Sequence, residues 1–261
     1  MGFWPVVKKV IKESDIILVI LDARMPELFR NKELERICRY FKKKYFYVFN
    51  KIDLVSNENL SSLRKFYKDY FFVSGVNNVG MKKLKESILI YSKREKIDDP
   101  LIGVVGYPNV GKSAIINALA KRAKARVSRI AGTTKGIQWI NAGSLRILDS
   151  PGVVYHKDTE TKIGIMGAKN PEKLKEPERV AFQLIRELLF TDKAFLENNY
   201  GIQIERDDDE EIILEKIGKA KYYFLKKGIV DTYRTAIKVL RDWQTGKPSQ
   251  TFNCRSKGHM S

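Results

Sequence analysis

The sequence predicts an α/β fold in which helices cover both faces of a mainly parallel sheet, followed by a smaller all-α domain. Up to about residue 165, short apolar segments alternate with amphipathic helical patterns. This alternation is typical of parallel strands joined by crossover helices. Beyond that point strand patterns fade and helical periodicity dominates. We therefore expect two domains, residues 1–164 and residues 165–261.

Six segments have the apolar character and length of strands. They are Ile16–Leu21, Tyr45–Phe49, Phe71–Val73, Leu101–Val105, Gln138–Ile140 and Leu145–Leu148. Helical patterns lie around residues 30–42, 57–69, 79–92 and 112–124, and later at 177–190, 212–227 and 232–243. A charged stretch, residues 92–100, ends in Asp98-Asp99-Pro100 and is typical of a linker between elements.

A glycine-rich segment, Gly106–Ser113, matches the pattern G-x-x-x-x-G-K-S between a predicted strand and a predicted helix. In such a loop the glycines let backbone N–H groups converge on phosphates, and the helix N-terminus adds positive potential. Lys112 is expected to bridge the β- and γ-phosphates, and the Ser113 hydroxyl to bind Mg²⁺. The loop residues expected to contact the nucleotide are Asn109, Val110, Gly111, Lys112 and Ser113.

Two further segments have residues that suit a nucleotide-dependent switch. Asp149 and Gly152, in Asp149-Ser150-Pro151-Gly152, follow a strand 36 residues beyond Ser113. Asp149 is placed to hold Mg²⁺ through water, and Gly152 offers an N–H near the γ-phosphate. In Gly132-Thr133-Thr134, a threonine hydroxyl would complete the Mg²⁺ shell only when a γ-phosphate is present. Thr134 is the first choice for this role and Thr133 the second; a loop with incidental threonines is the competing interpretation.

The segment Asn50-Lys51-Ile52-Asp53 ends a predicted strand and has the chemistry of guanine recognition. A carboxylate at Asp53 accepts from N1–H and from the 2-amino group of guanine, whereas adenine offers neither donor there. Asn50 would brace the loop, and the Lys51 stem would cover the ring. Ser74 and Gly75, which follow another strand, are the candidates for a backbone N–H donor to the guanine O6.

The order of these motifs is unusual, because the guanine-recognition segment comes roughly fifty residues before the phosphate loop. In this order the motifs resemble the circularly permuted Ras-like GTPases of the YlqF/RbgA (YawG) group. Asp22-Ala23-Arg24-Met25-Pro26 resembles the D-A-R-x-P segment of that group, and residues 231–247 are similar to the end of its helical C-terminal domain. The resemblance covers nearly the whole chain. It implies a Ras-like phosphate-loop sheet in permuted order.

The resemblance also implies a function. Members of this group are ribosome-assembly GTPases that act mostly on the large subunit and contact ribosomal RNA. The resemblance implies GTP or GDP as the ligand, with Mg²⁺ held by Ser113, Thr134 and Asp149. In addition, Asn109 resembles the asparagine of potassium-activated GTPases, so K⁺ is a further candidate ion. The residues expected to take part in hydrolysis are Lys112, Thr134, Gly152 and Asn109.

One departure from Ras-like enzymes concerns the attacking water. Val153 stands where these enzymes usually carry a water-orienting glutamine, so we expect slow intrinsic hydrolysis. Some members of the group use an N-terminal histidine, but the first 155 residues contain none. His156 is a candidate, although a solvent-facing loop histidine is the simpler interpretation. The competing function is a GTP-dependent protein adaptor with little intrinsic hydrolysis.

The charge of the chain favours a polyanionic partner. The net charge is +18, and residues 1–153 hold 29 Lys and Arg against 14 Asp and Glu, more than one bound nucleotide requires. We expect contact with ribosomal RNA, with ribosomal proteins as further candidate partners. The absence of a long apolar stretch or signal-peptide pattern argues against a membrane partner. We therefore expect a cytoplasmic monomer; a role in tRNA modification or membrane targeting ranks last.

Overall fold

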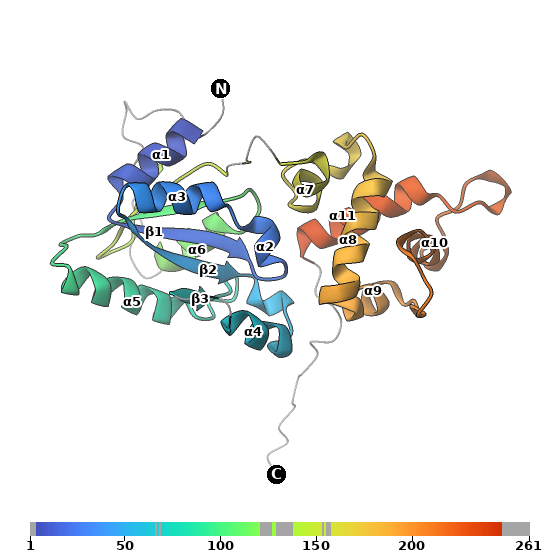
Figure 1. Ribbon diagram of the computed structural model, residues 1–261, viewed down its shortest axis with the longest axis horizontal. Helices are drawn as coiled ribbons and strands as arrows, with labels where there is room; N and C mark the ends of the chain where they lie inside the picture. The colour runs from blue at the N-terminus through green and yellow to red at the C-terminus, as the bar shows by residue number, and fades with distance from the viewer. Residues whose placement is uncertain are drawn as a thin grey trace, which may run out of the picture. The chain divides into compact units, whose positions relative to one another are not determined.

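The computed structural model describes residues 4–65, 67, 69–120, 127–128, 138–152, 154 and 158–246. The chain divides into two compact units, residues 1–158 and residues 159–261 (Figure 1). The first unit contains the sheet, and the second is helical. This confirms the predicted fold class, an α/β domain followed by a smaller all-α region.

In the described part of the first unit, the sheet has seven strands in the order β3-β2-β1-β4-β7-β6-β5. Their bounds are β1 (Ile16–Asp22), β2 (Lys44–Asn50), β3 (Tyr70–Phe72), β4 (Leu101–Gly106), β5 (Val127–Ser128), β6 (Gln138–Asn141) and β7 (Arg146–Asp149). Neighbouring strands are parallel from β3 to β7, whereas the β7–β6 and β6–β5 pairs are antiparallel. All six predicted strands are present, and the two-residue β5 is additional.

The sheet register gathers the carboxyl ends of the central strands at one edge. Asp22 at the end of β1 pairs with Asn50 at the end of β2, and Ile20 on the other side pairs with Gly106 at the end of β4. The Ala23 N–H donates to the Asn50 carbonyl at 2.8 Å. Ligands of parallel sheets bind at this edge, so the sheet brings together the predicted base and phosphate segments.

Helices cover both faces of this sheet. They are α1 (Trp4–Glu13), α2 (Pro26–Phe29), α3 (Lys32–Tyr40), α4 (Asn57–Arg64), α5 (Met81–Arg94) and α6 (Lys112–Ala120), with a 3-10 turn η1 (Ile52–Leu54). In Figure 1, α1 and α3 lie along one side of the sheet and α5 along the other. Helices α3 to α6 confirm the four predicted patterns: α3 and α4 are shorter than predicted, α5 has the predicted length two residues later, and α6 is described as far as Ala120. Helices α1 and α2 are additional. Because α5 continues to Arg94, the connection to β4 is shorter than the predicted linker.

The second unit packs helices around α8 and α11. Its elements are α7 (Glu160–Ile165), η2 (Pro171–Lys173), α8 (Pro177–Thr191), α9 (Lys193–Tyr200), α10 (Glu210–Ala220), η3 (Lys226–Gly228) and α11 (Thr232–Thr245). Trp243 of α11 is only 2% exposed, and its Nε1–H donates to the Ile165 carbonyl at 3.0 Å. This bond and the surrounding apolar contacts fix α11 against α7. No described helix is both long enough and apolar enough to span a bilayer.

The helix predicted over residues 212–227 is wrong beyond Ala220. Tyr222 has a left-handed backbone with φ 57°, and Phe224 pairs with Val230 in an antiparallel bridge. Lys227 and Gly228 are also left-handed, with φ 66° and 73°, which allows the chain to reverse. A short hairpin therefore replaces the last two predicted helical turns.

Candidate functional site

The loop between β4 and α6 has the backbone of a phosphate-binding loop. Asn109 and Gly111 have positive φ values of 59° and 93°, and α6 begins directly after Gly111 at Lys112. Alternation of right- and left-handed residues turns successive N–H groups toward one concavity, which is the geometry that binds anions at a helix N-terminus. The Lys112 Nζ lies over this loop, donating to the carbonyls of Tyr107 at 2.8 Å and Gly106 at 3.2 Å.

The charges of Lys112 and Asp149 are coupled. Burial lowers the pKa of Lys112 to about 8, and the neighbouring Asp149 carboxylate opposes that shift. Burial likewise raises the pKa of Asp149, while Lys112 lowers it. The Asp149 Oδ1 atom is buried without a hydrogen-bond partner among the described residues. A buried carboxylate oxygen without a partner is costly, so this atom is suited to a ligand or a hydrated cation.

The Asp149–Gly152 segment lies against the phosphate loop. The Ser150 Oγ donates to the Val104 carbonyl of β4 at 2.8 Å, which anchors the segment at the end of the sheet. A Cβ atom built on Gly152 would lie 2.8 Å from the Pro108 Cα. Only glycine permits this approach without displacement of the loop. The two segments predicted to contact the γ-phosphate are therefore brought together.

Asn50 joins the predicted base-recognition segment to the loop between β4 and α6. Its Nδ2–H donates to the Val110 carbonyl at 2.9 Å, and its Oδ1 accepts from the Gly75 N–H at 3.0 Å. A Cβ atom on Gly111 would lie 2.1 Å from the Asn50 Nδ2. One side chain thus connects three segments, at positions 50, 75 and 110, that are far apart in the sequence.

The other predicted base-recognition residues surround this bridge. Lys51 has a left-handed backbone with φ 66° and precedes η1, where the Asp53 side chain is exposed. Ser74 is buried, and its Oγ accepts from the Asn77 N–H at 3.2 Å. A Cβ atom on Gly75 would lie 3.0 Å from the Ile115 N of α6. The two base-side loops therefore lie beside the start of the phosphate-loop helix.

Sequence analysis gave no role to Asp22 and Arg24, which form a buried ion network with Lys51. Asp22 is fully buried, and its carboxylate accepts from the Arg24 guanidinium at 2.7 and 3.0 Å and from the Lys51 Nζ at 2.8 Å. Burial alone would raise the pKa of Asp22, but Arg24 and Lys51 outweigh burial and hold it well below its usual range. Burial lowers the pKa of Lys51, against the attraction of Asp22.

This network fixes the direction of Lys51. The Arg24 and Asp22 side chains contribute a bidentate pair at the end of β1, and Asp22 holds the ammonium group of Lys51, the residue that directly follows β2. The sequence signal was the Asp22-Ala23-Arg24 segment itself, which the resemblance highlighted without a role. Its pairing with Lys51 depends on the β1–β2 register, in which Asp22 faces Asn50.

Several predicted residues lie outside the described part of the chain. They are Thr133, Thr134, Val153 and His156.

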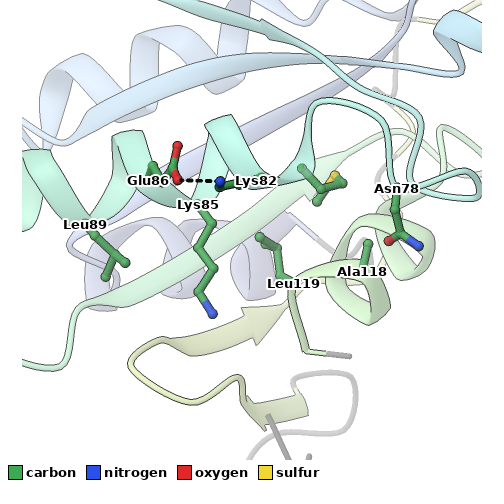
Figure 2. Close-up of a pocket in the computed structure, with 8 residues that line it drawn as sticks. Asn78, Lys82, Lys85, Glu86, Leu89, Ala118 and Leu119 are labelled. Atoms are coloured by element: carbon green, nitrogen blue, oxygen red, sulfur yellow. Dashed lines mark ion pairs between the residues drawn. The ribbon is translucent and has the colours of Figure 1, made fainter. Parts of the chain in front are cut away.

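A separate cleft of about 370 Å³ lies between α5 and α6, and Figure 2 shows residues that line it, with Lys82 and Glu86 paired at 3.8 Å. The described lining consists of Asn78, Met81, Lys82, Lys85, Glu86, Leu89, Ala118 and Leu119. None of these is a predicted nucleotide-site residue. The candidate nucleotide site is therefore the edge of the sheet where the loops after β1, β2, β4 and β7 meet.

The chain matches two GTPase families in sequence. The RsgA GTPase family matches residues 5–157, and the family described as 50S ribosome-binding GTPase matches residues 101–219. An uncharacterized GTP-binding protein of Methanocaldococcus jannaschii is 39% identical over 244 residues, which cover 93% of this chain and 65% of that protein. Nuclear/nucleolar GTPase 2 of Oryza sativa subsp. indica is 35% identical over 254 residues, covering 94% and 46%.

Solved structures agree with this assignment at the level of fold. GNP-bound YlqF from T. maritima has a TM-score of 0.59 and 20% identity, covering 94% of each chain. The GDP-bound form has a TM-score of 0.63 and 20% identity, covering 93% of this chain and 95% of that one. The chain spans between about half and two thirds of the length of these curated relatives. Since the RsgA GTPase family covers more than half of it, the chain belongs to the circularly permuted GTPases of the YlqF/YjeQ type, as the order of its motifs predicted.

Proposed function

We propose that this protein is a GTP-binding and GTP-hydrolysing switch that acts in assembly of the large ribosomal subunit through contact with ribosomal RNA. One observation carries the nucleotide part of this proposal. The side chain of Asn50 joins the base-recognition segment to the phosphate loop at 2.9 Å. A base and a triphosphate are recognised by one ligand site only if these two segments are held in fixed register.

The residues divide into a base end and a phosphate end. At the base end, the exposed Asp53 accepts from guanine N1–H and the 2-amino group, and the Lys51 stem covers the ring. The Ser74 and Gly75 loop lies beside Asn50. Because the Gly75 N–H donates to Asn50 and the Ser74 N–H donates to the Val79 carbonyl, either group would donate to the guanine O6 only after giving up that bond. At the phosphate end, the backbone from Asn109 to Ser113 holds the phosphates, and Lys112 exchanges its carbonyl partners for phosphate oxygens. Those carbonyl contacts hold the ammonium close to its working position.

The residues present fit Mg²⁺. The unpartnered, buried Asp149 Oδ1 and the exposed hydroxyl of Ser113 on the first turn of α6 are both hard oxygen donors of the kind that Mg²⁺ prefers. Mg²⁺ held there would neutralise charge on the phosphates. Thr134, or Thr133, would join this set from the segment before β6. The exposed, left-handed Asn109 is the proposed K⁺ ligand.

Hydrolysis in this proposal depends on charge neutralisation. Lys112 and the Gly152 N–H stabilise negative charge that develops on the γ-phosphoryl group, and Asn109 with K⁺ adds to this effect. Val153 offers no group that could orient water, so the intrinsic rate is slow and the ribosomal partner completes the site. The same valine favours the second candidate, a GTP-dependent protein adaptor with little intrinsic hydrolysis.

The ribosomal part of the proposal is supported by two independent lines. Residues 1–153 carry an excess of positive charge that suits RNA. One of the matching families is described as 50S ribosome-binding GTPase, and the rice relative is named a nuclear/nucleolar GTPase. Both lines favour a ribosomal particle as the partner.

Co-sedimentation with purified ribosomal subunits tests this proposal. The protein is incubated in potassium buffer with GDP or with a non-hydrolysable GTP analogue, and a Lys112→Ala variant is the nucleotide-binding control. The proposal expects analogue-dependent pelleting with the large subunit, which Lys112→Ala loses, and phosphate release that the subunit accelerates. Analogue-dependent pelleting without any accelerated phosphate release would favour the adaptor. Equal pelleting with both nucleotides would contradict a switch.

A further inference from the structure

The connection between α10 and α11 forms a short hairpin, residues 221–230, that we call the basic hairpin. Phe224 pairs with Val230, and the Leu225 N–H donates to the Ile229 carbonyl at 2.7 Å. Lys227 and Gly228 form its tip, both with left-handed backbones. A Cβ atom on Gly228 would meet nothing within 4 Å. Figure 1 shows this connection extending beyond the ends of the two helices that it joins.

The hairpin exposes large apolar side chains to an unusual degree. Tyr222 is 83% exposed, Ile229 61% and Leu225 54%. Phe224 in the hairpin and Tyr233 at the start of α11 are also exposed, at 44% and 49%. Isolated exposed apolar residues are ordinary, but a contiguous group marks an interaction site. These five residues lie within one stretch of twelve.

Positive charge is concentrated on the same stretch. Residues 219–234 hold five Lys and Arg and one Asp, whereas the rest of residues 159–261 holds fourteen Lys and Arg and fifteen Asp and Glu. The only acidic residue of the stretch, Asp231, caps α11 by accepting from the Arg234 N–H at 2.9 Å. Its carboxylate is directed to the helix rather than to the lysines. All of the positive excess of the second unit therefore lies at the hairpin.

Of the positively charged side chains in this stretch, Arg234 packs on an aromatic ring, whereas Lys226 and Lys227 are unpaired among the described residues. Arg234 lies 4.2 Å from the centroid of the Tyr223 ring, a cation–π pair that orders the base of the hairpin. Lys226 and Lys227 at the tip make no ion pair within the described part of the chain. Two unpaired lysines between exposed Leu225 and Ile229 present charge and apolar surface together, which suits a phosphate backbone with accessible bases.

We infer that the basic hairpin is an RNA-docking element, in which Lys226 and Lys227 contact phosphates while Tyr222 and Phe224 stack on unpaired bases. Aromatic stacking combined with lysine contacts is how proteins hold single-stranded RNA. An apolar protein groove is the competing partner; it would bind the exposed apolar side chains without depending on the two lysines at the tip. The inference rests on the proposed ribosomal function, and it assigns the second unit a direct part in RNA binding.

Ultraviolet cross-linking of the full chain to deproteinised large-subunit ribosomal RNA tests this inference, with peptide mapping of the cross-links. The inference expects adducts on the peptides that contain Tyr222 or Phe224. Adducts confined to residues 1–158 would overturn the hairpin assignment and leave the proposed function standing. No adduct anywhere on the chain would overturn both.

Binding measurements with variants give an independent readout. A Lys226→Ala, Lys227→Ala double variant should lower the salt slope of RNA affinity by roughly 1.4–1.8, because each lost phosphate contact contributes about 0.7–0.9. Tyr222→Ala should weaken binding by about tenfold. The matched control is Lys173→Ala, Lys175→Ala, which removes two exposed lysines of the same unit and should leave binding unchanged.

Either of two results would refute the RNA assignment. An unchanged slope in the tip double variant, with circular dichroism showing native helix content, would show that the tip does not contact phosphates. Dependence of intact-subunit binding on Leu225 and Ile229, together with indifference to Lys226, Lys227 and salt, would identify a protein groove instead.

Discussion

The Asn50 side chain donates to the Val110 carbonyl at 2.9 Å and accepts from the Gly75 N–H at 3.0 Å. The predicted base-recognition segment precedes the phosphate loop by roughly fifty residues, so no short connection along the chain holds the two together. The bridge supplies that connection through space. Asn50 and Val110 are both buried, which shields the hydrogen bond from water and makes its loss costly.

Asn50→Ala should weaken GDP affinity by at least tenfold and lower the free energy of unfolding by about 2 kcal/mol, because a buried carbonyl and a buried N–H lose their partner. Fluorescent-GDP titration and urea denaturation measure the two effects. Asn50→Asp is the matched variant, since it keeps an acceptor for Gly75 and replaces the donor to Val110 with a second acceptor oxygen and a buried negative charge. If both variants bound GDP like the native chain, the bridge would have no role in nucleotide binding.

Gly111→Ala should abolish tight nucleotide binding. The new methyl group would approach the Asn50 Nδ2 at 2.1 Å, and Gly111 also has a left-handed φ of 93°. Gly201→Ala is the matched control, because Gly201 has a φ of 67° and open space around its Cβ position. That control shows what a side chain at a left-handed position costs in stability when there is no clash, about 1 kcal/mol. Equal GDP affinity in the two variants would argue against the bridge geometry.

The buried Asp22 network predicts a pH-dependent contribution to stability. Because the folded-state pKa of Asp22 lies below its unfolded value of about 3.9, the carboxylate stabilises the fold above that pH, and the contribution is lost as pH falls through the folded pKa. Asp22→Asn should therefore cost about 3 kcal/mol at pH 7, by removing one partner of a buried ion network. The difference from the native chain should shrink below about pH 4.

Denaturant unfolding between pH 3 and pH 8 measures this prediction. Glu86→Gln is the control, since Glu86 pairs with Lys82 at 3.8 Å on an exposed helix surface and should contribute less than about 1 kcal/mol. A pH-independent difference between Asp22→Asn and the native chain would show that packing, rather than charge, explains the loss.

The sequence was sufficient to predict elements whose information is local. The residues of Gly106–Ser113 predict a phosphate-binding loop between a strand and a helix. The structure has such a loop, with positive φ values at Asn109 and Gly111 and a helix that begins at Lys112. Lys227 and Gly228 show the opposite case. Apolar spacing over residues 212–227 favoured one helix, but two left-handed residues and the bridge from Phe224 to Val230 reverse the chain instead. Periodicity alone does not report a reversal.

Contacts between segments were the part that the sequence did not reveal. The pairing of Lys51 with Asp22 depends on the register of β1 with β2, and register is a property of the assembled sheet. Helix α1 was also missed, although Val7, Val10 and Ile11 follow helical spacing and are buried.

Asp53→Asn should change the base that the site prefers. An amide presents donors where guanine also presents donors, whereas xanthine has a carbonyl in place of the 2-amino group and can accept. GTP affinity should fall by about a hundredfold or more, and xanthosine triphosphate should become the better ligand. Competition against a fluorescent nucleotide measures both affinities, with Asp69→Asn as the control because Asp69 is an exposed carboxylate that pairs with Lys44. A guanine preference that survives in Asp53→Asn would move base recognition to another residue, whereas a reversal would identify the exposed carboxylate of η1 as the group that selects guanine.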